Sequence, residues 1–177
     1  MTLLTAFNAL LYKYSKQKDI VIGVPVSNRY SSDFENIIGY FVNTTIFRNQ
    51  LEDSCKLNSL LHQVKKGAIG SMSHKELPFE LLLGEIETER SQSFLPIFQV
   101  LFSHQEFVST EQDEGPEETN DENDEIPSQF GTSKFDLSLS FGENTNRLAG
   151  SFEFSTDLFD VEFIRRMRDD YKAILWK

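Results

Sequence analysis

The sequence has little of what marks several common protein classes. Its one cysteine, Cys55, excludes an internal disulfide and fits a reducing compartment, so we expect a cytoplasmic protein. No apolar run approaches the ~20 residues that span a bilayer, and the first residues lack the basic stretch of a secretory signal. We therefore expect no membrane attachment, and 177 residues are enough for one domain with its own core.

Basic clusters are also scarce. The chain has 17 Lys and Arg against 28 Asp and Glu, and its net charge of −11 argues against binding to a nucleic-acid backbone. Nine of the acids lie in residues 109–129, a segment without a single base. This segment has too little apolar material to offset the entropy of ordering it, so we predict a disordered acidic insert at 109–129.

Recognisable catalytic and metal-binding patterns are missing. The three histidines, His62, His74 and His104, are not adjacent, and none is followed four residues later by an aspartate. Histidine and cysteine are too scattered for a metal site, and no G-x-S-x-G segment is present. The residues alone therefore predict no catalytic residue and no metal ligand.

Hydrophobic periodicity predicts an α/β protein of about five strands and four helices. Mixed order along the chain favours a two-layer arrangement, with helices mainly on one face of a mixed sheet. Pro25 is expected either to end the first strand or to lie where that strand is a sheet edge. Gly67 and Gly70 lower the stability of their helix, so we expect a close packing contact to require each of them. The expected helices are 2–14, 54–73, one starting at Pro78 and one capped by Asp160; the expected strands are 19–24, 40–48, 97–103, 134–141 and 148–154.

Six stretches resemble, in the same order, the motifs of nonribosomal peptide synthetase condensation domains. Two of those motifs read I-G-x-F-V-N-T and A-H-Q-D-x-P-F-E. The six stretches are DIVIGVPVSNR at 19–29, IGYFVNT at 38–44, SHKELPFE at 73–80, LPIFQV at 95–100, SKFDL at 133–137 and FEFSTDLF at 152–159.

The resemblance implies that residues 1–177 form the C-terminal lobe of such a domain, a partial domain. The whole domain has two chloramphenicol-acetyltransferase-like lobes, and its H-H-x-x-x-D-G motif, absent from this chain, belongs to the N-terminal lobe. The implied reaction joins an acyl thioester and an acceptor amine, both held on phosphopantetheine arms of peptidyl carrier proteins, in an amide bond. No cofactor is expected to bind directly. The chain should be inactive alone, and its exposed lobe face should favour self-association.

The resemblance also assigns roles to single residues. Asn43, Gly39 and Thr44 become candidates for the substrate channel, although Asn43 is equally suited to bond backbone groups within its strand. We expect Arg29 to pair with Asp33 or Glu35. The remaining motif residues are expected to be structural: His74 at a helix end, Pro78, Phe79 and Glu80 at a helix start, and Asp136 and Asp157.

The sequence departs from the family pattern at several places. Asn28 replaces a common glycine, Lys75 and Glu76 replace a Gln-Asp pair, and one arginine before LPIFQV is absent. Two other readings therefore stay open. One is a lobe without catalysis that docks carrier proteins or is purely structural, and the other is a fragment of an epimerisation or cyclisation domain.

Overall fold

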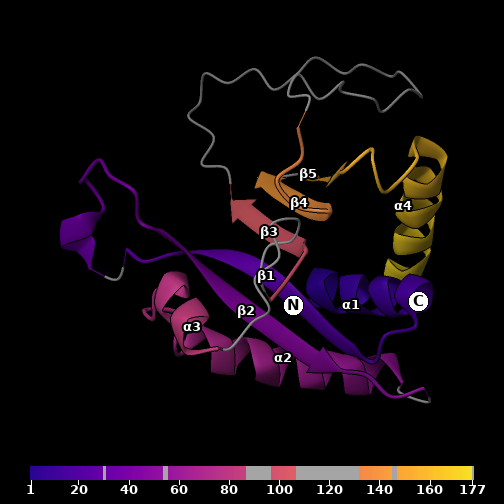
Figure 1. The fold of residues 1–177 in the computed structure, drawn as a ribbon, viewed down its shortest axis with the longest axis horizontal. Coiled ribbons are helices and arrows are strands. Elements are labelled where there is room, and N and C mark those ends of the chain that lie inside the picture. Colours follow the sequence, from indigo (N-terminus) through magenta and orange to yellow (C-terminus); the bar gives the residue numbers. More distant parts are fainter. Residues whose placement is uncertain (30, 54–55, 87–96, 107–131, 145–146, 177) are drawn as a thin grey trace.

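A computed structural model describes residues 1–29, 31–53, 56–86, 97–106, 132–144 and 147–176. Within these residues the chain forms one five-stranded sheet in the order β2-β1-β3-β4-β5 (Figure 1). The elements are α1 (Thr2–Ser15), β1 (Asp19–Ser27), the 3₁₀ helix η1 (Ser32–Phe34), β2 (Val42–Gln50), α2 (Leu57–Met72), α3 (Phe79–Glu85), β3 (Val100–Glu106), β4 (Leu137–Asn144), β5 (Arg147–Phe154) and α4 (Val161–Leu175).

The sheet is mixed, as predicted. β1 pairs with β2 and β4 with β5 in antiparallel register, whereas β3 lies parallel to both of its neighbours. The two antiparallel pairs are hairpins of adjacent strands. A parallel pair needs a longer connection, and between β1 and β3 the chain passes through β2, α2 and α3.

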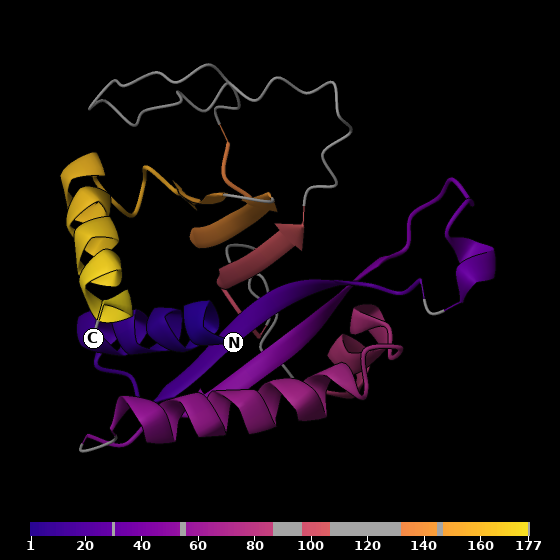
Figure 2. The same ribbon diagram turned by 180° about the vertical axis from the view of Figure 1, so that it is seen from behind.

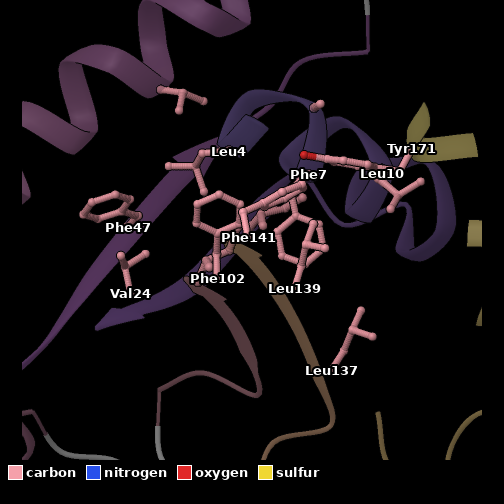
Figure 3. Packing of buried hydrophobic residues seen from close by; sticks show 14 of the residues in the cluster. Leu4, Phe7, Leu10, Val24, Phe47, Phe102, Leu137, Leu139, Phe141 and Tyr171 are labelled. Atoms are coloured by element: carbon pink, nitrogen blue, oxygen red, sulfur yellow. The ribbon is translucent and has the colours of Figure 1, made fainter. Parts of the chain in front are cut away.

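One face of the sheet packs against helices α1, α2 and α4. Alternate side chains of β1, including Ile22 and Val24, are buried on this face. A chain of aromatic rings links the two layers, from Phe7 of α1 through Phe102 and Phe141 of the sheet to Tyr171 of α4, with centroids 5.9 to 6.0 Å apart (Figure 3). Helix α2 packs along β2 (Figure 2).

On the opposite face of the sheet, the Phe98 ring packs over Gly23 of β1. A Cβ on Gly23 would lie 2.2 Å from a ring carbon of Phe98, so only glycine leaves room for the ring. Phe98 is 3% exposed and stacks between Phe79 of α3 and Phe135, at centroid distances of 5.6 and 5.7 Å. The preceding Ile97 has φ +81°, a strained value for a β-branched residue, which breaks the strand before Val100.

Several predicted boundaries were wrong. β1 continues to Ser27 and does not stop at residue 24. Of the two alternatives for Pro25, the edge position agrees with the structure, because β1 pairs with β3 only at Gly23 and is an edge on that side at Pro25. β3 begins at Val100 instead of residue 97. Residue 54, where the second helix was predicted to begin, and the acidic insert at 109–129 lie outside the described residues.

The two helical glycines differ. A Cβ on Gly67 would sit 3.4 Å from Asn49 Oδ1, whereas a Cβ on Gly70 would meet nothing within 4 Å. The predicted packing reason is therefore wrong for Gly70. Across the part of the chain that the structure describes, none of the helices has the length and apolar character needed to cross a bilayer.

Candidate substrate-binding pocket

The connection between β1 and β2 projects away from the helical layer as an arm with η1 at its tip (Figures 1 and 2). We call residues 28–29 and 31–41 the β1–β2 arm. The backbone N–H of Asn28 donates to the carbonyl of Phe41 over 2.8 Å and closes the base of the arm. In the part of the arm that returns to β2, Ile38 and Tyr40 are 101% and 90% exposed.

Arg29 braces the arm from inside. Its guanidinium donates to the carbonyl oxygen of Phe34 and lies 4.1 Å from the centroid of the Phe41 ring. The Phe34 and Phe41 rings are themselves 5.8 Å apart. The predicted pairing of Arg29 with Asp33 or Glu35 is wrong, because the planar guanidinium instead combines a ring face with a backbone acceptor.

Asn43 lies at the start of β2 and fastens the α2–α3 connection to the sheet. Its Nδ2 donates to the carbonyls of Lys75 and Leu77 over 2.8 and 2.7 Å, and its Oδ1 accepts from the N–H of Phe79 over 3.2 Å. The bond to Phe79 satisfies an N-terminal amide of α3. Asn43 therefore does serve backbone groups, but these belong to another segment and not to its own strand.

A cavity of about 620 Å³ lies where the arm, the start of β2 and the start of α3 meet. Asn43 and Thr44, two of the three residues predicted to lie near a substrate channel, line this cavity. Gly39 does not; it is exposed beside the Phe41 ring, 3.2 Å from where its Cβ would be. The lining residues are Asn28, Phe34, Tyr40, Phe41, Val42, Asn43, Thr44, Glu76, Pro78, Phe79 and Glu80.

The pocket wall offers acceptors and apolar rings but few donors. Glu76 and Glu80 contribute carboxylates, and no lysine, arginine or histidine is among the lining residues. Both Nδ2 hydrogens of Asn43 are already used. The wall also holds no nucleophile with an adjacent base, so the pocket can bind and orient a ligand but has no visible means of proton transfer.

The other motif residues have structural surroundings. α3 starts at Phe79, one residue later than predicted, so Pro78 is its N-cap and not its first helical residue. Glu80 lies in the first turn of α3. The backbone of Asp136 bonds Gln99 and Ser155. Asp157 lies in the turn before α4, and His74 follows the end of α2, where backbone bonds of His74 with Ser71 and Leu77 form the turn. His74 therefore lies next to a helix end, and none of the interactions among the described residues involves its imidazole.

A second cavity, of about 450 Å³, lies at the far end of β1 and β2. Two of its three charged lining residues are in ion pairs: Lys18 with Asp53 at 2.6 Å, and Asp19 with Arg48 at 2.6 Å. The third is the exposed Glu52. Hydrogen bonds from Lys18 and Tyr12 hold the pKa of Asp53 below its usual value. Because Lys18 and Asp19 already have charged partners, we assign this cavity no ligand. The described residues contain no cluster of three or more His, Cys, Asp or Glu arranged to hold a metal ion.

Comparison with known proteins decides the family. The family model of the condensation domain matches residues 1–177. The chain belongs to the condensation-domain family. Linear gramicidin synthase subunits C and B of Brevibacillus parabrevis are 40% and 39% identical to it over 176 residues. These matches cover 99% of this chain but only 2% and 3% of the synthases, so the chain spans a small part of the curated relatives it matches.

Solved structures agree on the condensation-domain fold. A four-domain nonribosomal peptide synthetase bound to AMP and glycine matches with a TM-score of 0.84 at 23% identity, over 99% of this chain and 14% of that one. The condensation domain of a monacolin K polyketide synthase matches with a TM-score of 0.76 at 18% identity, over 98% of this chain and 40% of that one. The prediction of a mixed α/β, chloramphenicol-acetyltransferase-like fold is confirmed.

Sequence reasoning missed two residues of this condensation-domain pocket region. Asn28 was noted only as a departure from the family pattern, yet it lines the cavity. The signal was a polar side chain at a position where the motif usually has none. Phe98 was counted as a strand residue, but its ring packs on Phe79 at the pocket wall; a lone glycine inside β1 was the only hint of this contact.

Proposed function

We propose that this chain is the C-terminal lobe of a nonribosomal peptide synthetase condensation domain and takes part in amide-bond formation. The observation that carries the proposal is the family match over all 177 residues, which include six motif stretches in family order. The acyl thioester and the acceptor amine would both arrive on phosphopantetheine arms of peptidyl carrier proteins, in the cytoplasm. The arms are substrates carried by partners and not a resident cofactor.

In this proposal the chain binds and positions the two substrates, and another lobe supplies the general base. The sequence has no adjacent histidine pair and no H-H-x-x-x-D-G, so the proton of the attacking amine must go to a residue outside these 177. The chain would contribute one wall of the substrate channel, with Thr44 lining it. Asn43 would act indirectly, because its bond to the N–H of Phe79 holds α3 against β2. Positioning of two bound reactants lowers the barrier by removing the entropy cost of bringing them together.

The test is a complementation experiment. Donor and acceptor carrier proteins loaded with amino acids are incubated with the chain alone, with a separately produced N-terminal lobe that has H-H-x-x-x-D-G, and with both. Mass spectrometry of the carrier-bound products reports the dipeptide. We expect product above the background without enzyme only when both lobes are present.

Each other result has a defined meaning. Product from the chain alone would contradict the need for the second lobe. Carrier binding without product in the complemented mixture would favour a docking lobe without catalysis. An inverted configuration of the carrier-bound residue, or a cyclic product, would favour an epimerisation or cyclisation domain.

Self-association is part of the same proposal. A lobe that normally faces a partner should leave apolar side chains uncovered, and Ile38, Tyr40 and Trp176 are at least 90% exposed. We expect light scattering to show a concentration-dependent dimer or larger species. Addition of the N-terminal lobe should replace it with a one-to-one complex, and a monomer at all concentrations would count against the exposed face.

A further inference from the structure

Asn28 carries an unpaired acceptor at the pocket. It follows β1 at the base of the β1–β2 arm, and its backbone N–H is used by Phe41. Its side-chain oxygen Oδ1 is buried and has no hydrogen-bond partner among the described residues. The side chain of Asn43, which lines the same cavity, makes three hydrogen bonds, one of them through its Oδ1. A buried acceptor without a partner is costly, so a ligand or rearrangement that supplies a donor is favoured.

The surroundings select the kind of ligand. Glu76 and Glu80 place two carboxylates on the wall, and the lining contains no cationic side chain. Two cations lie beside the pocket, but both have partners: Arg29 has the Phe34 carbonyl and the Phe41 ring, and Lys75 Nζ donates to the Ser27 carbonyl over 3.4 Å. A phosphate would therefore meet the two carboxylates and only cations that are already engaged. Aromatic rings of Phe34, Tyr40 and Phe41 complete the wall. The Arg29 guanidinium already lies over the Phe41 ring, so the exposed Tyr40 ring is the one left to attract the cation of a ligand. The pocket therefore fits the amine end of a carrier-bound substrate and not its phosphate end.

We propose that Asn28 is a specificity-determining residue of this pocket: its carboxamide oxygen accepts a hydrogen bond from the protonated amino group of the acceptor aminoacyl substrate. The inference rests on the proposed function and adds a residue to it. The oxygen meets the amine after the carboxamide turns toward the cavity that it already lines.

Asn28 is better placed than the carboxylates to give direction to the contact. Glu76 and Glu80 are exposed, so water and salt weaken their attraction for a cation. The Asn28 side chain is half-buried, and Asn43 is held by its bonds to the α2–α3 connection. The carboxylates would raise the local concentration of cations, whereas Asn28 would fix where the amine points.

The experiment is a titration of the ¹⁵N-labelled full chain with alanyl-pantetheine in which an amide replaces the thioester. Its N-acetyl derivative, which lacks the cation, is titrated in parallel. We expect saturable shifts of backbone resonances around the pocket, with weaker binding of the acetylated probe. Asn28→Ala should bind the amine probe about tenfold more weakly, the loss of one hydrogen bond to a charged group. Asn28→Asp, which keeps an acceptor, should bind at least as tightly as the unmodified chain.

Asn58→Ala is the matched control, because Asn58 is an exposed residue of α2 away from the pocket lining. It should bind like the unmodified chain. The midpoint of thermal unfolding of Asn28→Ala should not fall, since the substitution removes an unpaired buried acceptor. A variant that melts as usual and has lost affinity has therefore lost a ligand contact and not its fold.

Failure of this inference can be told apart from failure of the proposed function. No binding of the amine probe by the unmodified chain, or equal binding by Asn28→Ala, would overturn the role of Asn28. In the complemented assay, Asn28→Ala should raise the KM for the loaded acceptor carrier about tenfold with little change in kcat. If product forms but this KM is unchanged, the proposed role of Asn28 is wrong and the condensation function stands. If the unmodified chain with its N-terminal lobe makes no product, the proposed function fails. The titration then still tests whether Asn28 binds the amine.

Discussion

Tyr14 donates a hydrogen bond from its hydroxyl to Oδ2 of Asp170 over 2.7 Å, and so joins the last turn of α1 to α4, 156 positions along the chain. The same carboxylate oxygen lies 2.5 Å from Lys13 Nζ. This contact connects the two helices whose packing closes one end of the core. Partial burial, and then the hydrogen bond and charge of Asp170, raise the pKa of Tyr14 to about 12.

Alkaline pH should weaken this connection in a defined window. A tyrosine whose folded pKa lies above its usual value of 10 contributes stability that is complete below pH 10 and is lost as the pH rises through 12. We expect the unfolding midpoint to fall between pH 10 and 12, and Tyr14→Phe to lower it at neutral pH but to reduce its pH dependence. Tyr40→Phe, at a 90% exposed site, is the control. An unchanged alkaline slope in Tyr14→Phe would contradict the prediction.

Removal of the Asn43 amide should loosen α3. Asn43→Ala leaves two carbonyls and the N–H of Phe79 without their partners, and we expect a loss of about 2 kcal/mol in the free energy of unfolding. Faster hydrogen exchange at the Phe79 amide should accompany it. Asn43→Asp keeps the acceptor but loses both donors, and should be no more stable than Asn43→Ala. Normal exchange at Phe79 in both variants would show that α3 is held by other contacts.

Two glycines should respond in opposite directions to the same substitution. Gly23→Ala places a Cβ within 2.2 Å of the Phe98 ring, and we expect a loss of about 3 kcal/mol through overpacking. Gly70→Ala meets nothing and lies inside α2, so it should gain about 0.5 kcal/mol by restricting the unfolded chain. Urea unfolding of the two variants measures both. A stable Gly23→Ala would mean that Phe98 can leave its position at little cost.

Arg29→Lys should free the β1–β2 arm without unfolding the domain. Lysine keeps the charge but lacks the planar group that both stacks on Phe41 and donates to the Phe34 carbonyl. We expect faster proteolysis within residues 31–41 and an unchanged unfolding midpoint. Arg166→Lys, whose guanidinium lies 6.0 Å from the Phe163 ring on α4, provides a matched control. Equal cleavage of both variants would show that Arg29 does not brace the arm.

Local sequence determined most of the elements. Alternation in 134–141 and 148–154 appears as the β4–β5 hairpin, and the cap Asp160 accepts from the N–H of Phe163 over 2.6 Å at the start of α4. These features depend on neighbours a few residues away, so their pattern is visible in one sequence. The motif order also placed the chain in its family.

Tertiary structure alone decided the pocket and the strand limits. Asn43 bonds a connection more than 30 positions away, Gly23 accommodates a ring from residue 98, and Arg29 meets Phe41 in place of a nearby acid. Each of these contacts joins segments that no local rule brings together, because side-chain partners are chosen by packing after the sheet has formed. The single cysteine and the scarcity of basic clusters, by contrast, are properties of composition that the sequence shows without any structure. Which side chain leaves an acceptor unpaired at the cavity became visible only when β1, β2 and α3 were folded against one another.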